Sequence, residues 1–445
     1  MKKLYIFFLL TVISTSTLLA SNRLSVYWQT PTMTSNDARN LAKFDLVIVD
    51  VENWANNPET VAEILKYNSD CVLLKYINPM ELFDPQVDGR PWQGMIYNSV
   101  TAFHHNWWLK QPNGAPIYYW HSPRMRMLNL SSKCPVDKHG NTWGGYLVQH
   151  MKASADAEPI AGLFIDNTFD NISWMYEGNI DVNCDGLRDH PDSLDLWWRQ
   201  GVEKFLQLLE SDLVIGNEAN LEYKNLLDGK MWENFPPADF GKSWYASMQN
   251  YLSELSEMEY NIIHSEPKGE QWRMFTLCSA LLGDGLYCYG TNHYGWYPEY
   301  NLIKKLGKPV GPAQSSYMLV WGQVINNLYE KKVVSDSLPA GEYIVSYKYS
   351  LVRRPNQLVC EAVSKKYGGI FPYSQQIHER WLEGFIHQKV TLTSKGRIVW
   401  RSQVPAVISD MEIKLVQKLP WVRKYEHGEV LVYPDEQRGE IRIYK

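Results

Sequence analysis

Short apolar runs alternate with longer amphipathic segments along most of the chain. Runs of about four to eight apolar residues bounded by turn residues are typical of buried strands, whereas apolar residues every three or four positions are typical of helices. This pattern predicts eight strands, at residues 24–28, 44–51, 71–77, 160–167, 213–217, 230–233, 261–265 and 285–289. Helical segments lie between them at residues 36–43, 58–67, 146–155, 194–209, 242–258 and 271–282.

Strands that alternate with helices indicate parallel βαβ units, and eight such units predict an α/β fold of the (β/α)8 TIM-barrel class. An open doubly wound sheet is the alternative. It should carry a phosphate-binding glycine fingerprint after the first strand, and Trp28-Gln29-Thr30-Pro31 is not one. From residue 307 the pattern changes to short alternating runs separated by turn residues, which predicts a C-terminal β-sandwich domain.

The start of the chain has the pattern of a secretory signal peptide. Met1-Lys2-Lys3 precede a short apolar core and a Ser/Thr-rich stretch that ends at Ala20. We therefore expect residues 1–20 to be removed on export to the periplasm or the cell exterior, residues 21–306 to form the barrel and residues 307–445 the sandwich. No segment reaches the roughly 20 apolar residues of a membrane span. The net charge of −5 favours neither nucleic acid nor an anionic membrane surface.

Six cysteines are spread along the chain, too far apart for a zinc ribbon or a CxxC redox motif. Export permits disulfides, but the sequence selects no pairing. A bridge between Cys134 and Cys184 is one of the pairings that remain open.

Catalytic groups of barrel enzymes gather where the strands end. In this chain the strand ends carry mostly carboxylates, amides and aromatic rings. The catalytic candidates are Asp166 after the fourth strand, Glu218 after the fifth and Glu233 after the sixth. The candidates for substrate binding are Trp28, Asp50, Lys75, Asn167, Asn217, His264 and His293.

Glycoside hydrolysis fits these residue types, because it needs one carboxyl to protonate the leaving oxygen and a second as nucleophile or base. Any two of the three carboxylates could serve. Each also has a purely structural explanation: Asp166 could cap a helix, Glu218 could pair with Lys75, and Glu233 could be solvated. A GxSxG elbow and an HExxH motif are both missing from the sequence, which disfavours serine and zinc hydrolases.

We therefore expect a glycoside hydrolase that acts on a poly- or oligosaccharide. A Trp-rich insertion at residues 80–144, with Trp92, Trp107, Trp108, Trp120 and Trp143, is expected to line the sugar cleft. The alternative is a non-catalytic carbohydrate-binding protein on a degenerate barrel.

Residues 181–192 follow the pattern of a calcium-binding loop. Gly186 stands at loop position 6, and the Leu187 carbonyl is available at position 7. Side-chain oxygen donors occupy the positions of Asp181, Asn183, Asp185, Asp189 and Asp192. No helix clearly precedes the loop, and an ordinary Asp/Asn/Gly turn is the alternative. We expect a structural Ca²⁺ beside Asp166 and no organic cofactor.

Several of these stretches resemble one known family. They are residues 44–50 (FDLVIVD), 162–167 (GLFIDN), the 181–192 loop, 216–218 (GNE) and 421–432 (WVRKYEHGEVLV). They look like the hypothetical bacterial TIM-barrel glycoside hydrolases, which are related to endo-α-1,4-polygalactosaminidase-like enzymes. The resemblance implies that Asp166 is the nucleophile and Glu233 the general acid/base of a retaining mechanism. It does not fix the sugar.

Overall fold

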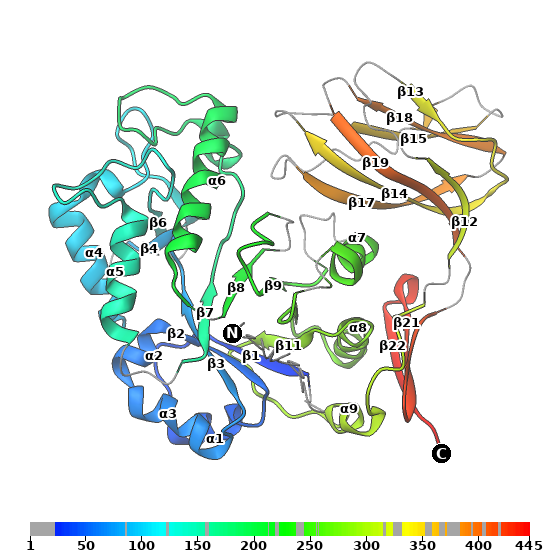
Figure 1. Cartoon of the computed structure of the whole chain (residues 1–445), viewed down its shortest axis with the longest axis horizontal. Helices are drawn as coiled ribbons and strands as arrows, with labels where there is room; N and C mark the ends of the chain where they lie inside the picture. The colour runs from blue at the N-terminus through cyan, green and yellow to red at the C-terminus, as the bar shows by residue number, and fades with distance from the viewer. Residues whose placement is uncertain are drawn as a thin grey trace, which may run out of the picture.

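The structure is a computed structural model of the whole chain. It describes residues 23–84, 87–121, 124–155, 160–211, 213–218, 222–236, 244–254, 256, 258–314, 317–323, 332–351, 358–364, 370–371, 383–392, 395–402, 406–416 and 420–445. The predicted signal peptide lies outside these residues. Figure 1 shows a barrel surrounded by helices, a separate pair of β-sheets and a small sheet near the C-terminus.

Eight parallel strands close into a barrel in the order β1-β11-β10-β9-β8-β7-β3-β2. They are β1 (Leu24–Trp28), β2 (Leu46–Asp50), β3 (Val72–Ile77), β7 (Gly162–Ile165), β8 (Val214–Asn217), β9 (Gly229–Trp232), β10 (Ile262–Ser265) and β11 (Leu286–Thr291). Each overlaps one of the eight runs identified in the sequence. The predicted TIM barrel is therefore confirmed.

Helices between the strands cover the outside of the barrel (Figure 1). They are α1 (Ser35–Leu41), α2 (Val51–Asn56), α3 (Pro58–Tyr67), α5 (Trp143–Ala155), α6 (Pro191–Leu208), α7 (Trp244–Gln249), α8 (Glu270–Leu281) and α9 (Tyr300–Leu306). Local sequence explains several starts. Thr34 and Asp37 form a capping box on α1, and prolines occupy the first turn of α3 and α6.

Residues 242–258, expected as one helix, form α7 followed by a π-helical turn at Asn250–Glu254. Tyr251 lies in that turn and is buried. Its hydroxyl donates to the Ala280 carbonyl at 2.7 Å and accepts the Gly285 N–H at 2.8 Å. The turn thus links the end of α8 to the start of β11.

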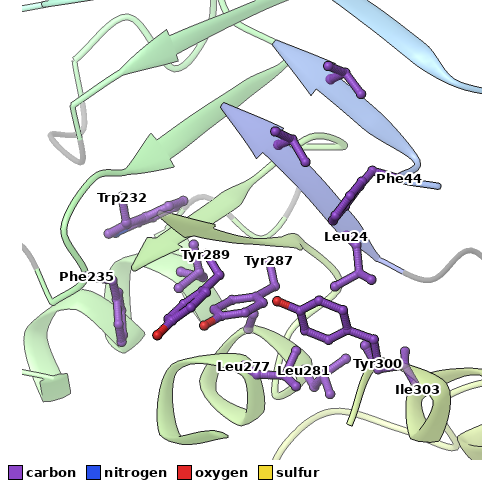
Figure 2. Packing of buried hydrophobic residues seen from close by; sticks show 14 of the residues in the cluster. Leu24, Phe44, Trp232, Phe235, Leu277, Leu281, Tyr287, Tyr289, Tyr300 and Ile303 are labelled. Carbon is purple, nitrogen blue, oxygen red and sulfur yellow. The ribbon is translucent and has the colours of Figure 1, made fainter. Parts of the chain in front are cut away.

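An apolar layer between the barrel strands and helices α8 and α9 fixes the strands in place. Figure 2 shows Trp232 of β9 and Tyr287 of β11 in this layer, with Leu277 and Leu281 of α8 and Ile303 of α9. All five side chains are almost completely buried. Because protein interiors are close-packed, this layer limits how far the ends of β9 and β11 can move.

An insertion between β3 and α5 carries a sheet of its own, in the order β4-β6-β5. Its elements are β4 (Glu81–Phe83), α4 (Pro91–Phe103), a 3-10 turn (His105–Trp107), β5 (Tyr118–His121) and β6 (Arg124–Met127). Trp107 and Trp108 are buried in its apolar core, together with Trp143 of α5. The expectation that the insertion tryptophans line a cleft is therefore wrong for Trp107, Trp108 and Trp143.

The C-terminal part contains two four-stranded sheets, in the orders β12-β19-β14-β17 and β13-β18-β15-β16. Their strands are β12 (Tyr317–Gln323), β13 (Lys332–Val334), β14 (Gly341–Leu351), β15 (Leu358–Ser364), β16 (Ile370–Phe371), β17 (Glu383–Leu392), β18 (Gly396–Ser402) and β19 (Ala406–Val416). Tyr347, Trp400 and Ile413 belong to one buried cluster that joins the two sheets. The predicted β-sandwich is confirmed.

The last three strands form a separate antiparallel sheet that packs on α8: β20 (Trp421–Tyr425), β21 (Gly428–Tyr433) and β22 (Arg438–Ile443). Tyr425 donates its hydroxyl proton to the Leu281 carbonyl at 2.5 Å. Arg423 donates to Asp284 Oδ1 at 2.8 Å. These strands, expected as part of the sandwich, therefore bind the barrel. The domain boundary at residue 307 stays a prediction.

Five cysteines in the described residues are free thiols, including Cys134 and Cys184, so a bridge between those two is not formed. The described helices include none with both the length and the apolar composition to cross a membrane.

Gly439 tests the contact between β22 and α8. A Cβ added there would lie 2.4 Å from the Met274 carbonyl oxygen and 2.7 Å from Cys278 Cβ. Because backbone cannot yield easily, we expect Gly439→Ala to lower the free energy of unfolding by about 1–3 kcal/mol in urea denaturation. Gly311 is the matched control, since a Cβ there meets nothing within 4 Å. Equal stability of the two variants would contradict this packing.

Candidate active site

Alternate positions of each barrel strand fill the barrel interior. This inner cluster includes Ile48, Leu74, Tyr76, Phe164, Ile215 and Met231. At the carboxyl ends of four strands, a polar residue stands two positions after one of these inward-facing residues. These polar residues are Asp50, Asp166, Asn217 and Glu233. The alternation that packs the barrel therefore also turns these four polar side chains toward its axis.

A cavity of about 680 Å³ lies at these strand ends. Six of the predicted site residues line it: Asp50, Asp166, Asn167, Asn217, Glu218 and Glu233. The insertion contributes other lining residues, among them Glu81, Arg90, Tyr119 and Trp120. Trp120 is 53% exposed and is the insertion tryptophan that meets the expectation of a cleft-lining ring.

One amide joins two of the candidate carboxyls. Asn217 Nδ2 donates to Asp166 Oδ1 at 2.8 Å and to Glu233 Oε2 at 2.6 Å. The Glu218 N–H donates to Asn217 Oδ1 at 2.9 Å, which fixes the orientation of this amide. Asp166 and Glu233 are therefore close neighbours, whereas the side chain of Glu218 stands beyond the strand on a residue with φ 94°.

Asp166 accepts two further hydrogen bonds, from the Tyr76 hydroxyl at 2.6 Å and from the Asn167 N–H at 2.8 Å. Burial and the neighbouring charge of Glu233 raise the pKa of Asp166 to about 6, while the three donors oppose that rise. Burial also raises the pKa of Glu233, against the effect of its bond from Asn217. The pair therefore titrates nearer to neutrality than isolated carboxyls do.

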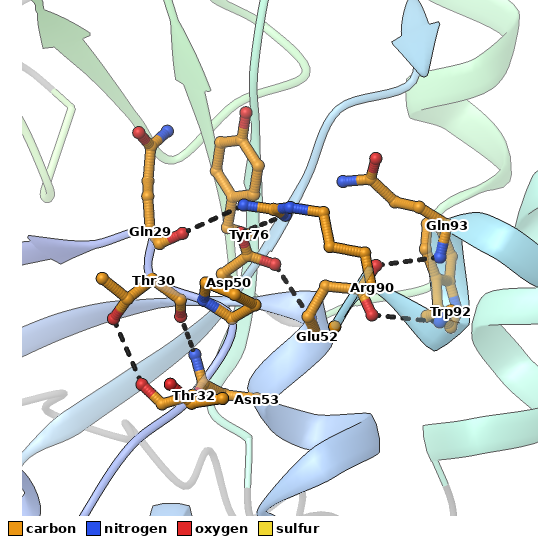
Figure 3. A network of polar contacts seen from close by, with 12 residues as sticks. Gln29, Thr30, Thr32, Asp50, Glu52, Asn53, Tyr76, Arg90, Trp92 and Gln93 are labelled. Carbon is orange, nitrogen blue, oxygen red and sulfur yellow. Dashed lines mark hydrogen bonds and ion pairs between the residues drawn. The ribbon is translucent and has the colours of Figure 1, made fainter. Parts of the chain in front are cut away.

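A polar network anchors the insertion to the barrel (Figure 3). Arg90 Nη1 donates to Asp50 Oδ2 at 3.0 Å, at the edge of the cavity. Glu52 is fully buried, and its carboxylate accepts the N–H groups of Trp92 and Gln93 at 3.0 and 2.9 Å. These N–H groups belong to the first turn of α4, where an anion is favourable. The second barrel strand thus holds one wall of the cavity.

Glu81 is a cavity carboxyl that the sequence did not single out. It is 2% exposed, and its Oε1 accepts from Asn78 Nδ2 at 3.1 Å and from Asn167 Nδ2 at 3.2 Å. Burial, followed by repulsion from Asp166, raises the pKa of Glu81 to about 8. No strand-end signal marks it, because it begins a strand of the insertion. Arg90 also lines the cavity from the insertion, just before α4, and no strand-end signal marks it either.

Trp28 and Lys75 are not among the residues that line the cavity. Trp28 directly follows Tyr27 on β1, and Lys75 directly precedes Tyr76 on β3. The two tyrosines are the side chains that face the barrel interior. Lys75 Nζ instead lies 5.5 Å from the centre of the Trp54 ring, and Trp28 stacks on Tyr294. Counting alternate positions back from the strand end would have identified the two tyrosines.

His264 and His293 also lie outside the cavity lining. His264 is buried, which lowers its pKa to about 4, and its Nδ1 accepts the Asn234 N–H at 3.2 Å. It therefore supports the turn that follows Glu233. His293 lies 2.6 Å from the Tyr297 hydroxyl through its Nε2.

The loop at residues 181–192 forms a network of turns. Asp181 accepts the N–H groups of Asp185 and Gly186 at 3.2 and 2.9 Å, and Asp189 accepts that of Val182 at 2.8 Å. Burial raises the pKa of Asp189, and repulsion from Asp181 and Asp185 adds to that rise. In the described part of the chain, no three His, Cys, Asp or Glu side chains are grouped as a metal site.

A closed (β/α)8 barrel with a pair of neighbouring carboxyls at its strand ends has the architecture of a TIM-barrel glycoside hydrolase. The model of the hypothetical glycosyl hydrolase family 15 matches residues 65–330, which is more than half of the chain. The protein belongs to this family. A search among curated proteins finds no match.

Solved structures of carbohydrate-active proteins resemble the chain at low identity. A maltogenic α-amylase from Thermotoga neapolitana is 9% identical, with 90% of this chain and 100% of that chain covered and a TM-score of 0.38. A sulfoquinovosidase from E. rectale is 10% identical, with 85% and 62% covered and a TM-score of 0.41. The chain spans 56% of a Paenibacillus cycloisomaltooligosaccharide glucanotransferase, with 87% of this chain covered at 9% identity and a TM-score of 0.32.

The hydrogen bond from Tyr76 predicts a measurable effect on Asp166. Removing the hydroxyl in Tyr76→Phe takes away a donor that stabilises the ionised carboxylate, so the pKa of Asp166 should rise by roughly one unit or more. Carboxyl ¹³C NMR against pH measures this directly. Tyr287→Phe is the control, because the Tyr287 hydroxyl contacts Thr276. An Asp166 titration that does not move in Tyr76→Phe would contradict the contact.

Proposed function

We propose that the protein is an exported, retaining glycoside hydrolase that cleaves a poly- or oligosaccharide with Asp166 as nucleophile and Glu233 as general acid/base. The observation that carries this proposal is the single Asn217 amide that bonds both carboxyls, at 2.8 and 2.6 Å. Two oxygens bonded to one nitrogen at these lengths lie within the ~5.5 Å that separates the carboxyl pair of retaining enzymes. An inverting pair, at about 6.5–9.5 Å, leaves room for a water between the groups.

The hydrogen bonds supply the reason for the two roles. A carboxyl that accepts more N–H and O–H donors is the better ionised member of a pair. Asp166 accepts from Tyr76, Asn217 and Asn167, and so it carries the charge. Glu233 accepts from Asn217, and its partial burial raises its pKa, so we assign the proton to Glu233.

In the first step the Asp166 carboxylate forms a bond to the anomeric carbon while Glu233 gives its proton to the leaving glycosidic oxygen. In the second step Glu233, now ionised, takes a proton from a water molecule. The resulting hydroxide oxygen displaces Asp166 from the anomeric carbon. The configuration at that carbon is thus inverted twice and retained overall.

Export rests on the pattern of residues 1–20. The sugar class rests on the family and on the aromatic and amide groups of the cavity, such as Trp120 and Asn167. A non-catalytic carbohydrate-binding protein on the same barrel remains the second candidate, because amides and aromatic rings also bind sugars without cleaving them.

Two variants, each of which replaces one carboxyl by an amide, distinguish a hydrolase from a non-catalytic binding protein. The substrate comes from a panel of hexasaccharides of glucose, galactose and their N-acetyl derivatives. Glu233→Gln should lower kcat by about 10²- to 10⁴-fold, the contribution of a positioned general acid, and Asp166→Asn should abolish turnover. Both should still bind the oligosaccharide in calorimetry. Glu218→Gln is the comparison. A larger loss of kcat in Glu218→Gln than in Glu233→Gln would make Glu218 the general acid/base. Full activity of Asp166→Asn would contradict the mechanism.

We also propose that the 181–192 loop binds a structural Ca²⁺. Its support is the row of oxygen donors at calcium-loop spacing, together with the repulsion that Asp181 and Asp185 exert on Asp189, which a cation would relieve. Each carboxylate oxygen that accepts a backbone N–H keeps a second lone pair for a metal. The role would be to fix the loop that follows β7 and Asp166.

Calcium removal tests this loop. A chelator should lower the melting temperature, because an ion present at about 100 times its Kd stabilises the fold by about 2.7 kcal/mol. Asp185→Ala should make the melting temperature independent of the chelator. An unchanged melting temperature of the wild-type protein would make the segment an ordinary turn.

A further inference from the structure

We propose that Glu81 binds an oxygen atom of the substrate sugar as a neutral carboxylic acid, a role that rests on the proposed glycosidase function. It would make the insertion part of the binding site for the sugar ring that meets Asp166. The strand-end pattern of the barrel does not mark Glu81.

The two oxygens of Glu81 are in different situations. Oε1 accepts two N–H donors, from Asn78 and Asn167, at 3.1 and 3.2 Å. Oε2 is buried and has no hydrogen-bond partner among the described residues. Buried polar atoms are nearly always paired, and those that are not often belong to functional sites. Glu81 also lines the catalytic cavity, so a bound sugar can supply the missing partner.

The charges around Glu81 decide which form it takes. Its neighbour Asp166 is an ionised carboxylate in the proposed mechanism, and the Tyr76 hydroxyl is already donated to that group. Arg90, a cation of the cavity wall, is bound to Asp50. Glu218 and Glu233 line the other walls and add no positive charge. Burial and Asp166 together raise the pKa of Glu81 to about 8, so it holds a proton at neutral pH.

The proton belongs on Oε2, because both bonds from amide donors fall on Oε1. Glu81 then presents an O–H donor, whereas Asp166 presents only acceptors.

Asn167 places Glu81 near the reacting centre. Its side chain donates to Glu81 Oε1, and its own N–H donates to Asp166 Oδ1 at 2.8 Å. Asn167 has φ 54°, a left-handed conformation that asparagine tolerates better than most residues. One residue therefore connects the two carboxyls, and a sugar in contact with Asp166 is within reach of Glu81.

Binding measured against pH tests the assignment. The probe is whichever hexasaccharide of the panel the wild-type enzyme hydrolyses fastest, bound to the inactive Glu233→Gln variant in calorimetry. Affinity should fall above a pH of about 8, by up to tenfold per pH unit, because the bound state needs the proton on Glu81. In the double variant Glu233→Gln/Glu81→Gln this fall should disappear, since the amide donates at every pH.

Glu63→Gln, in the same Glu233→Gln background, is the matched control. Glu63 also has an Oε2 without a partner among the described residues, but it lies on α3 and is not among the residues lining the cavity. Its replacement should leave the alkaline fall in affinity unchanged.

Glu81→Ala in the active enzyme removes the donor altogether and should raise KM roughly tenfold. Glu81→Gln should restore most of the loss, which a merely space-filling role would not require. If the alanine variant fails to fold, the calorimetric comparison of the glutamine variants still decides.

Two results would overturn the assignment. One is the same alkaline fall in affinity with and without Glu81→Gln; the other is a loss of turnover in Glu81→Gln as deep as in Glu233→Gln, which would make Glu81 the catalytic acid. Failure of the wild-type enzyme to hydrolyse any panel member would instead count against the proposed function. The two failures are therefore distinguishable.

Discussion

Two carboxyls, one buried and one partly buried, that share one amide donor are the constraint on which the rest of the site depends. Like charges this close in a desolvated barrel cannot both ionise easily. Asn217 stabilises the pair by donating to both, and the Glu218 N–H keeps its amide from turning over. Tyr76 and the Asn167 N–H also donate to Asp166, and these two bonds favour the ionised form of that carboxyl. The local arrangement thus makes two chemically similar groups unequal.

The scaffold holds this pair through contacts far from it. The apolar layer that includes Trp232 and Tyr287 fixes β9 and β11 against α8 and α9. The C-terminal sheet packs on the other side of α8 through Tyr425, whose hydroxyl bonds to the Leu281 carbonyl. On the opposite wall, Glu52 of α2 binds the first turn of α4 and so ties the insertion to the helix that follows the second strand.

The barrel and part of the site could be predicted from the sequence because both follow local patterns. Apolar runs identify the eight strands, and the polar residue after a run identifies Asp166, Asn217 and Glu233. Lys75 was misassigned because a strand turns successive side chains to opposite faces, so an error of one residue reverses inside and outside. The alternation of side chains along β3 favours Tyr76 as the residue that faces the barrel interior.

Tertiary structure alone brings the insertion to the cavity, so no spacing in the sequence marks Glu81. The same insertion shows why aromatic content was a poor guide: Trp107 and Trp108 fill its core, whereas Trp120 reaches the cleft. Tryptophan is favoured in both places, since it buries a large area and also offers a flat face. Composition cannot separate these uses.

The most direct measurement of the central claim is to trap the glycosyl-enzyme. A fluorinated glycosyl fluoride of the sugar that the enzyme hydrolyses slows the second step, and mass spectrometry of proteolytic peptides then locates the attached sugar. We expect the label on the peptide that contains Asp166, bonded to its carboxyl. A label on Glu233 or Glu218, or hydrolysis with inverted configuration and no labelled peptide, would contradict the roles that the shared Asn217 amide supports.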